Sequence, residues 1–278
     1  MTAQQPLVTY ARPPLTEVVI GVQFERLDKL DAAHLGLLWD KFRSRFPRTE
    51  QKPPLDSAIE RVGLRGPLAE PRLELLTEFR QRLWFLSDTG DELVQVQDDR
   101  FIRNWRRQPG EHSLYPRFGE LEPRFIDDMA VFTAFLEAEK LGSVDANQCE
   151  VTYVNIIART DHWSSHSDLS KVFRGWSSEY ATAVDWPMEA VQARTAHILN
   201  DARGEFVGRL HVAIEPAFAA PVGTSAEPVF RLVLTARGRP LGPGMSGIQA
   251  FLDLGHRAVV MSFDKMVTVD MQSAWGRA

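Results

Sequence analysis

Leu93-Val-Gln-Val-Gln-Asp-Asp-Arg-Phe-Ile-Arg-Asn-Trp-Arg-Arg107 is the stretch on which the fold prediction depends. From Leu93 to Gln97, valines alternate with glutamines, which is the two-residue period of a β-strand. The alternation stops at Asp98-Asp99 and resumes with apolar residues set among arginines. We therefore predict an amphipathic ribbon that forms the last strand of the first sheet.

The composition is that of a soluble globular protein. The 278 residues are 44% hydrophobic and 25% charged, enough for one large domain or two ordinary ones. The net charge of −5 opposes nucleic-acid binding by bulk electrostatics. The one cysteine, Cys149, excludes an intrachain disulfide and a multi-cysteine metal site, which fits a reducing compartment. We expect a cytoplasmic protein that does not bind membranes, because no apolar run approaches about 18 residues and no leader pattern precedes Arg12.

The first half of the chain predicts a flexible arm at residues 1–12 and an α+β lobe at residues 13–143. Asp31 is a candidate N-cap for a helix that runs to about Phe46. A second helix begins at Glu122-Pro123 and ends at Gly142, because proline fits a first turn and glycine follows a last one. The predicted strands are Leu15–Phe24, Ile59–Leu64, Leu73–Phe79, Leu83–Leu86 and the ribbon.

The second half, residues 144–278, repeats this order of elements. We predict strands at Cys149–Ala158, Val191–Leu199, Arg209–Glu215 and Val229–Thr235, a short helix at Asp168–Trp176 and a closing helix at Ile248–Val267. The fold class is α+β, with two β-α-β(3-4)-α lobes whose antiparallel strands form a curved sheet with helices on one face. The order is similar to that of the TATA-binding-protein type of fold, and an internal duplication is one reading of it. The alternative is a single domain of helix-grip type, in which a long C-terminal helix lies across one curved sheet.

Three blocks carry a family resemblance. They are Pro13-Pro14-Leu15-Thr16-Glu17-Val18-Val19, then Gln95-Val96-Gln97-Asp98-Asp99-Arg100-Phe101 with Asn104-Trp105-Arg106, and Phe251-Leu252-Asp253-Leu254-Gly255-His256-Arg257-Ala258-Val259-Val260 with Ser262-Phe263 and Trp275. In combination they resemble a sporadically distributed family of uncharacterised bacterial proteins of about this length. The resemblance covers nearly the whole chain and implies a full-length member, but it brings no catalytic residues. A patchy distribution is typical of accessory systems such as phage defence.

The sequence contains no strong catalytic motif: phosphate loop, nucleophile elbow and zinc helix are all missing. Asp253 and His256 are weak catalytic candidates, because residues three apart share a helix face and a carboxylate can orient a histidine base. The more favoured reading is a histidine packed against the sheet. His162 and His166 have the spacing of two metal ligands on a helix, but the serines around them indicate a loop. We predict no metal and no cofactor.

The ribbon is the best candidate for a binding surface. Its candidate residues are Arg100, Arg103, Asn104, Trp105, Arg106 and Arg107. Guanidinium groups beside aromatic rings suit phosphates or bases. The favoured alternative is sheet chemistry, in which the aromatic rings lie in the core and the arginines pair with carboxylates. On that reading, Gln95, Gln97 and Asn104 need buried partners and fix a strand register or a contact between subunits.

Taken together, these patterns favour a non-enzymatic binding or assembly protein that meets a protein partner or a second copy of itself. The first alternative is a nucleic-acid or nucleotide binder that uses the ribbon arginines. The second alternative is an enzyme centred on His256.

Overall fold

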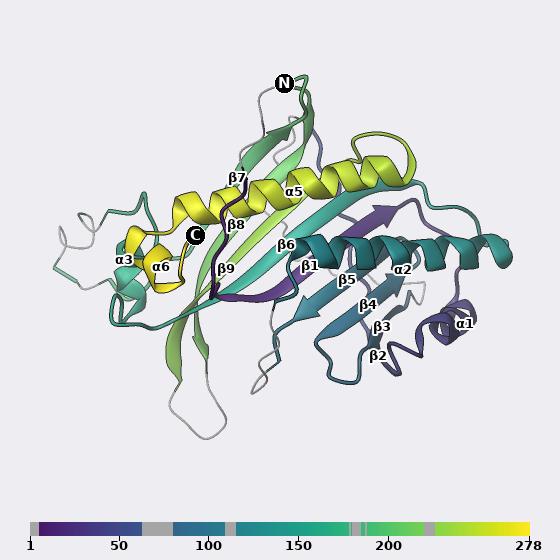
Figure 1. Cartoon of the computed structure of the whole chain (residues 1–278), viewed down its shortest axis with the longest axis horizontal. Coiled ribbons are helices and arrows are strands. Elements are labelled where there is room, and N and C mark those ends of the chain that lie inside the picture. Colours follow the sequence, from purple (N-terminus) through teal and green to yellow (C-terminus); the bar gives the residue numbers. More distant parts are fainter. Residues whose placement is uncertain are drawn as a thin grey trace.

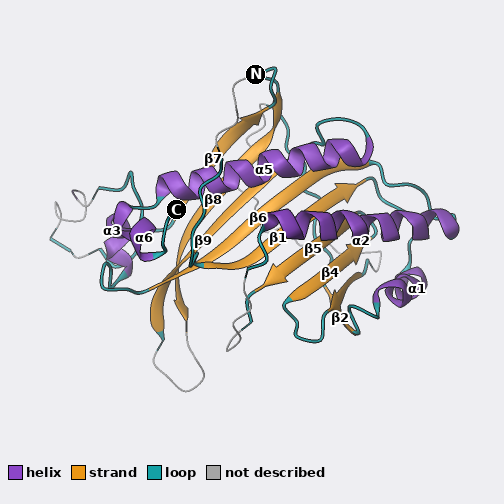
Figure 2. Cartoon of the chain, in the orientation of Figure 1, coloured by secondary structure: helices purple, strands orange, loops and turns teal. Residues whose placement is uncertain are grey.

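The computed structural model describes residues 6–62, 80–108, 115–177, 179, 185–186, 188–219 and 226–278. In this part of the chain nine strands form one antiparallel sheet, and the long helices lie on one face of it (Figures 1 and 2). The α+β prediction with an antiparallel sheet is thereby confirmed. The strands are β1 (Leu15–Phe24), β2 (Arg48–Lys52), β3 (Arg82–Leu86), β4 (Glu92–Gln97), β5 (Arg100–Arg106), β6 (Ala146–Ala158), β7 (Ala193–Asn200), β8 (Phe206–Ala219) and β9 (Glu227–Gly238). The helices are α1 (Ala32–Phe42), α2 (Phe118–Ala138), α3 (Leu169–Val172), α5 (Gly244–Met266) and α6 (Val269–Ala274), with a 3-10 turn η1 (His166–Asp168) before α3.

The strand order is the same in both halves of the chain. The sheet runs β2-β3-β4-β5-β1-β6-β9-β8-β7, so the first strand of each half pairs with the last strand of that half. β1 and β6 also pair with each other, antiparallel, at the centre of the sheet. One continuous sheet therefore spans both halves, and their division at residue 143 stays a prediction.

The long helices pack on the sheet through apolar contacts that the sequence pattern anticipated. α2 lies over β5, where Phe132 stacks on Phe101 with ring centroids 5.2 Å apart. α5 lies over β6 and β9, and Gly255 is one of its residues that face them. A Cβ atom there would stand only 3.2 Å from Ala236 and 3.3 Å from Val151, tighter than ordinary van der Waals contact. Glycine at this position thus lets the helix lie close to the sheet.

The ribbon is a hairpin and not the single strand we predicted. β4 and β5 pair along their length, and Asp98-Asp99 forms the turn between them. The backbone carbonyls of both aspartates accept hydrogen bonds from Leu27 and Phe24 at 2.9 Å, which ties the turn to the end of β1. The break in the alternation of valines and glutamines coincides with this turn. We did not predict a turn there, because two aspartates beside a basic strand do not by themselves indicate that the chain reverses.

Several predicted boundaries were wrong. Ile59–Leu64 is not a strand in its described part, and Leu73–Phe79 lies outside the described residues. β2 and α6 were not predicted, and α1 ends at Phe42. α2 begins four residues before the Glu122 that we expected, because buried Phe118 and Leu121 extend its apolar stripe by a turn.

The N-terminal arm pairs with the C-terminal segment. Backbone hydrogen bonds join residues 9–12 to residues 275–278. Tyr10 is buried and donates its hydroxyl to Asp264 at 2.8 Å, and Arg277 donates to both oxygens of the same carboxylate. Part of the arm that we expected to be flexible is thus attached to the last turn of α5.

Residues 53–61, called the strap below, cross the face of the sheet opposite to α2 and α5. Three glutamine side chains accept its backbone N–H groups: Gln97 from Leu55 at 2.8 Å, Gln23 from Ala58 at 3.0 Å and Gln148 from Glu60 at 3.1 Å. Glu60 then pairs with Arg209 of β8 at 2.7 Å. Gln95 and Asn104 bond each other at 2.7 Å. The buried amides of the ribbon therefore find their partners within the chain, and no contact between subunits is needed to satisfy them.

No helix in the described residues is long and apolar enough to cross a membrane.

A buried ion network holds α2 to the ribbon, and breaking it should destabilise the protein strongly. Arg103 is only 3% exposed and bonds both Asp128, which is fully buried, and Glu92. We expect Asp128→Ala to lower the free energy of unfolding by about 3–5 kcal/mol, because the buried guanidinium of Arg103 loses its fully buried carboxylate partner and keeps only Glu92. Urea denaturation measures this. Glu120→Ala, which removes an exposed partner of Arg124, is the control and should cost less than about 1 kcal/mol. An Asp128→Ala variant as stable as that control would contradict the role of the network.

Candidate functional site

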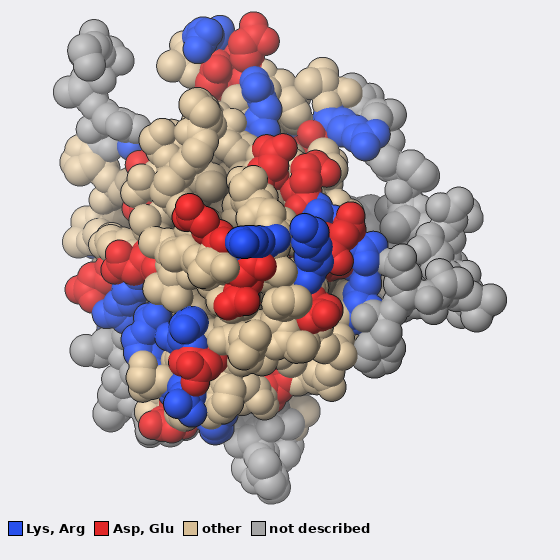
Figure 3. Space-filling view, turned by 90° about the vertical axis from the view of Figure 1, so that its right-hand side faces the viewer, with Lys and Arg blue, Asp and Glu red and all other residues tan. Residues whose placement is uncertain are grey.

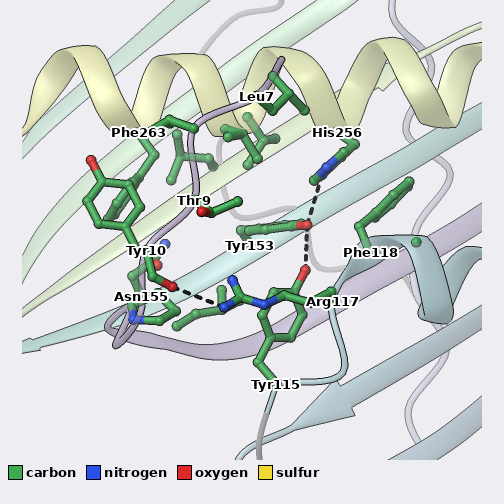
Figure 4. Close-up of a pocket in the computed structure, with 17 residues that line it drawn as sticks. Leu7, Thr9, Tyr10, Tyr115, Arg117, Phe118, Tyr153, Asn155, His256 and Phe263 are labelled. Atoms are coloured by element: carbon green, nitrogen blue, oxygen red, sulfur yellow. Dashed lines mark hydrogen bonds between the residues drawn. The ribbon is translucent and has the colours of Figure 1, made fainter. Parts of the chain in front are cut away.

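A cavity of about 350 Å³ lies on the helix face of the sheet, where the two halves meet. Its floor is β1, β6 and β9, its walls are the start of α2 and the second half of α5, and the N-terminal arm crosses it (Figures 1 and 4). Seventeen residues line it: Leu7, Val8, Thr9, Tyr10, Pro13, Leu15, Tyr115, Arg117, Phe118, Gly119, Tyr153, Asn155, Leu234, His256, Val259, Val260 and Phe263. The lining is mainly apolar, with a few polar groups, as is typical of sites for small organic molecules.

Three polar side chains form a hydrogen-bonded chain along one wall of the cavity. Tyr153, which points inward from β6, places its hydroxyl 2.8 Å from that of Tyr115 and 2.9 Å from Nδ1 of His256 (Figure 4). The ring of Phe118 stacks on His256 with centroids 4.0 Å apart and planes 2° from parallel. The imidazole is therefore held on its face by α2 and at one nitrogen by β6.

Burial keeps all three groups neutral near pH 7. Desolvation lowers the pKa of His256 to about 4, because the cavity wall disfavours the imidazolium. Burial likewise raises the pKa of Tyr115 to about 12 and that of Tyr153 well above its usual value. The chain thus consists of neutral donors and acceptors.

Among the described residues that line the cavity, Arg117 has the one charged side chain. It directly precedes α2, and its backbone angles, φ 70° and ψ 154°, lie in a region that non-glycine residues rarely adopt. Its Nη2 donates to the carbonyl of Tyr10 at 3.1 Å, and its guanidinium lies 5.6 Å from the centre of the Tyr115 ring. In Figure 4 its side chain extends toward the arm, and the residue is exposed to solvent.

The cluster around Asp264 closes the far side of the cavity by fixing the arm. Tyr10 meets Phe263 edge-on at 5.3 Å, and Phe263 stacks on Trp275. Burial and the bond to Asp264 raise the pKa of Tyr10, so the hydroxyl stays a donor. The carboxylate of Asp264 has a lowered pKa, chiefly because Arg277 donates to it.

The ribbon residues that we proposed as a binding surface do not lie together on the surface. Arg100, Arg103, Asn104 and Trp105 are buried, Arg106 is half-buried above the Trp84 ring, and Arg107 is exposed. The buried arginines pair with carboxylates, as the alternative reading expected. On the face seen in Figure 3, basic and acidic side chains are interspersed, unlike the single-sign surfaces that bind nucleic acids.

Of the two catalytic candidates, only His256 reaches the cavity. Asp253 is exposed and does not line the cavity, and the partner of His256 is Tyr153. Sequence reasoning missed Tyr115, Arg117 and Tyr153. One signal was present: Tyr153 and Asn155 share the inward face of a strand with Val151, so polar groups point toward the core.

Two other features fit a site less well. A larger groove of about 740 Å³ lies between the end of α2 and the start of α5, but no comparable chain of hydrogen-bonded side chains faces it among the described residues. His166 is buried, and its Nε2 lies 3.0 Å from the carbonyl oxygen of Val229, which fits a structural role. In the described ranges no group of three or more side chains that could hold a metal ion is found.

Comparison of the chain with protein-family models, with curated proteins and with solved structures gives no match.

Burial of His256 should make the stability of the protein depend on pH. Its pKa is about 4 in the folded protein and about 6.5 when exposed, so the unfolded chain binds more protons between these values. The stabilisation is complete above pH 6.5 and is lost as the pH falls toward 4, by an amount on the order of 3 kcal/mol. We expect His256→Gln to flatten this part of the stability profile, measured by urea denaturation at successive pH values. If stability falls equally with pH in the wild-type protein and in His256→Gln, His256 is not the cause of the pH dependence.

Proposed function

We propose that the chain is a binding protein whose cavity takes a small organic molecule with an apolar body and a polar end. The observation that carries this proposal is the cavity itself, in which the Tyr115–Tyr153–His256 chain forms the polar part of an otherwise mainly apolar wall. Small-molecule sites combine many apolar contacts with a few fixed hydrogen-bonding groups in this way. The volume, near the lower end of the range for such sites, favours a compact ligand.

The chain of Tyr115, Tyr153 and His256 can either donate a hydrogen bond to a ligand or accept one from it. A neutral imidazole has one donor and one acceptor nitrogen, and each tyrosine hydroxyl can be both. When Nδ1 of His256 accepts from Tyr153, its Nε2 carries the proton and donates; the opposite tautomer makes Nε2 an acceptor. No hydrogen bond to Nε2 is found in the described part of the chain, so a ligand can use this atom.

Binding has more support than catalysis. A general base works best when its pKa is near the working pH, and His256, with a pKa of about 4, is a weak base. Its hydrogen-bond partner is a tyrosine, which orients the ring but does not make it more basic as a carboxylate would. The enzyme alternative centred on His256 therefore ranks below a binding role.

Our expectation of a protein partner or a second copy has one supporting observation of its own. β7 is an edge strand of eight residues, mostly exposed, and its Ile198 is 67% exposed. An open edge of this length can pair with a strand of another chain. Assembly through β7 is the second candidate function.

Filling the cavity should abolish ligand binding. Val260 is half-buried in the cavity wall, and phenylalanine there would occupy the space of a ligand. We expect small apolar fragments that show saturation transfer from the wild-type protein in ligand-observed NMR to lose it with Val260→Phe. Val131→Phe, the same change at a half-buried position of α2 outside the cavity, is the control. Equal binding to both variants would show that the fragments bind elsewhere.

The edge of β7 is tested by changing its charge. If the chain pairs through β7, light scattering over a micromolar concentration series will show a dimer, and Ile198→Lys will return it to a monomer, because a lysine on the edge opposes pairing. Leu37→Lys, at an exposed position of α1, should leave the dimer unchanged. A wild-type protein that stays monomeric throughout rules out this candidate.

A further inference from the structure

We infer that the polar end of the ligand is a carboxylate, and that Arg117 binds it at the mouth of the cavity. This inference rests on the proposed function and narrows it to one class of ligand, small organic monocarboxylates. Three observations support it: the charge of the cavity lining, the position of α2, and Oδ1 of Asn155, an acceptor without a hydrogen bond in the described part of the chain.

The charge of the lining has one sign. Arg117 is cationic, and the other described residues of the lining include no Asp, Glu or Lys. Other arginines of the protein, such as Arg103 and Arg277, bond carboxylates of the chain itself. Among the described residues Arg117 has no such partner; its one hydrogen bond goes to the carbonyl of Tyr10. A guanidinium presents paired N–H donors that match the two oxygens of a carboxylate, so a ligand carboxylate would supply the missing partner.

The start of α2 adds to this positive potential. The helix has 21 residues, and its first two, Phe118 and Gly119, line the cavity. Its N-cap residue is Arg117, whose side chain makes no capping hydrogen bond, so no side-chain oxygen from that position neutralises the first turn. The N-terminal end of a helix attracts anions. Glu120, the acidic residue of the first turn, is exposed and pairs with Arg124 at 3.2 Å. The guanidinium of Arg117 and the helix end therefore both favour an anion at the start of α2.

Asn155 shows that the floor of the cavity is also prepared for a ligand. The residue is only 3% exposed, and it lines the cavity. Its Nδ2 donates to the carbonyl of Leu232 at 3.3 Å, and in the described ranges no hydrogen bond to Oδ1 is found. This oxygen is not one of the fully enclosed polar atoms that lack a partner, so it is accessible from the cavity. A hydroxyl or N–H group on the body of the ligand would satisfy Oδ1.

The rest of the lining defines the body of the ligand. Leu15, Leu234, Val259 and Phe263 surround a space that water would solvate poorly, so an aromatic ring or a short aliphatic chain gains by entering it. A highly charged ligand such as a nucleotide would place further phosphates against these apolar walls. The lining therefore fits a single charge at one end of a small apolar molecule.

The test compares ligands of one shape and different charge. Isothermal titration calorimetry with phenylacetate, phenylacetamide and 2-phenylethylamine should show the acid binding at least about tenfold more tightly than the amide, and the amine binding most weakly. A tenfold ratio corresponds to about 1.4 kcal/mol. Arg117→Gln should weaken phenylacetate about tenfold and change phenylacetamide little. Arg124→Gln, which alters a partly exposed arginine of α2 outside the cavity, is the matched control and should leave both affinities unchanged.

A second measurement needs no variant. Salt screens the attraction between Arg117 and a carboxylate but not the burial of a ring, so rising salt should weaken phenylacetate and leave phenylacetamide unaffected. If the amide binds as tightly as the acid, the inference is overturned and the proposed function stands. If none of the three probes binds, both are overturned.

Discussion

The antiparallel pairing of β1 with β6 joins the two halves of the chain. Because each of these strands also pairs with the last strand of its own half, this one antiparallel pairing makes a single sheet of both halves. It brings the start of α2 and the second half of α5 to either side of the same floor. The arm that leads into β1 must then pass over that floor. The cavity therefore lies over the junction of β1 and β6, called the seam below.

The seam is also where the two halves contribute different chemistry to one site. The first half supplies a cation and a helix end, through Arg117 and α2, and the second supplies neutral hydrogen-bonding groups, through Tyr153 and His256. Tyr115 joins the two sets, since its hydroxyl meets that of Tyr153. The arm is held over the site by the bond from Tyr10 to Asp264 at the end of α5 and by backbone bonds to residues 275–278. The strap lies on the opposite face of the sheet and leaves the cavity untouched.

The sequence predicted the architecture better than the site. Alternating valines and glutamines revealed strands, and helical spacing revealed α2 and α5, because these signals are local. The tertiary contacts are not local: Tyr115, Tyr153 and His256 are separated by 38 and 103 positions, and no periodicity links them. Asp253 was chosen for its spacing to His256, yet only one of these two residues faces the cavity. The sequence did not show that Arg103 is buried, because its partner Asp128 comes from a helix that follows later in the chain.

The most direct test of the account is to locate a bound ligand by NMR. If the seam is the binding site, a fragment in the cavity will show intermolecular NOEs to the ring protons of both Phe118 and Phe263, which belong to different halves of the chain. NOEs only to residues of the larger groove, such as Met245, would place the ligand there and contradict a binding site between the two halves.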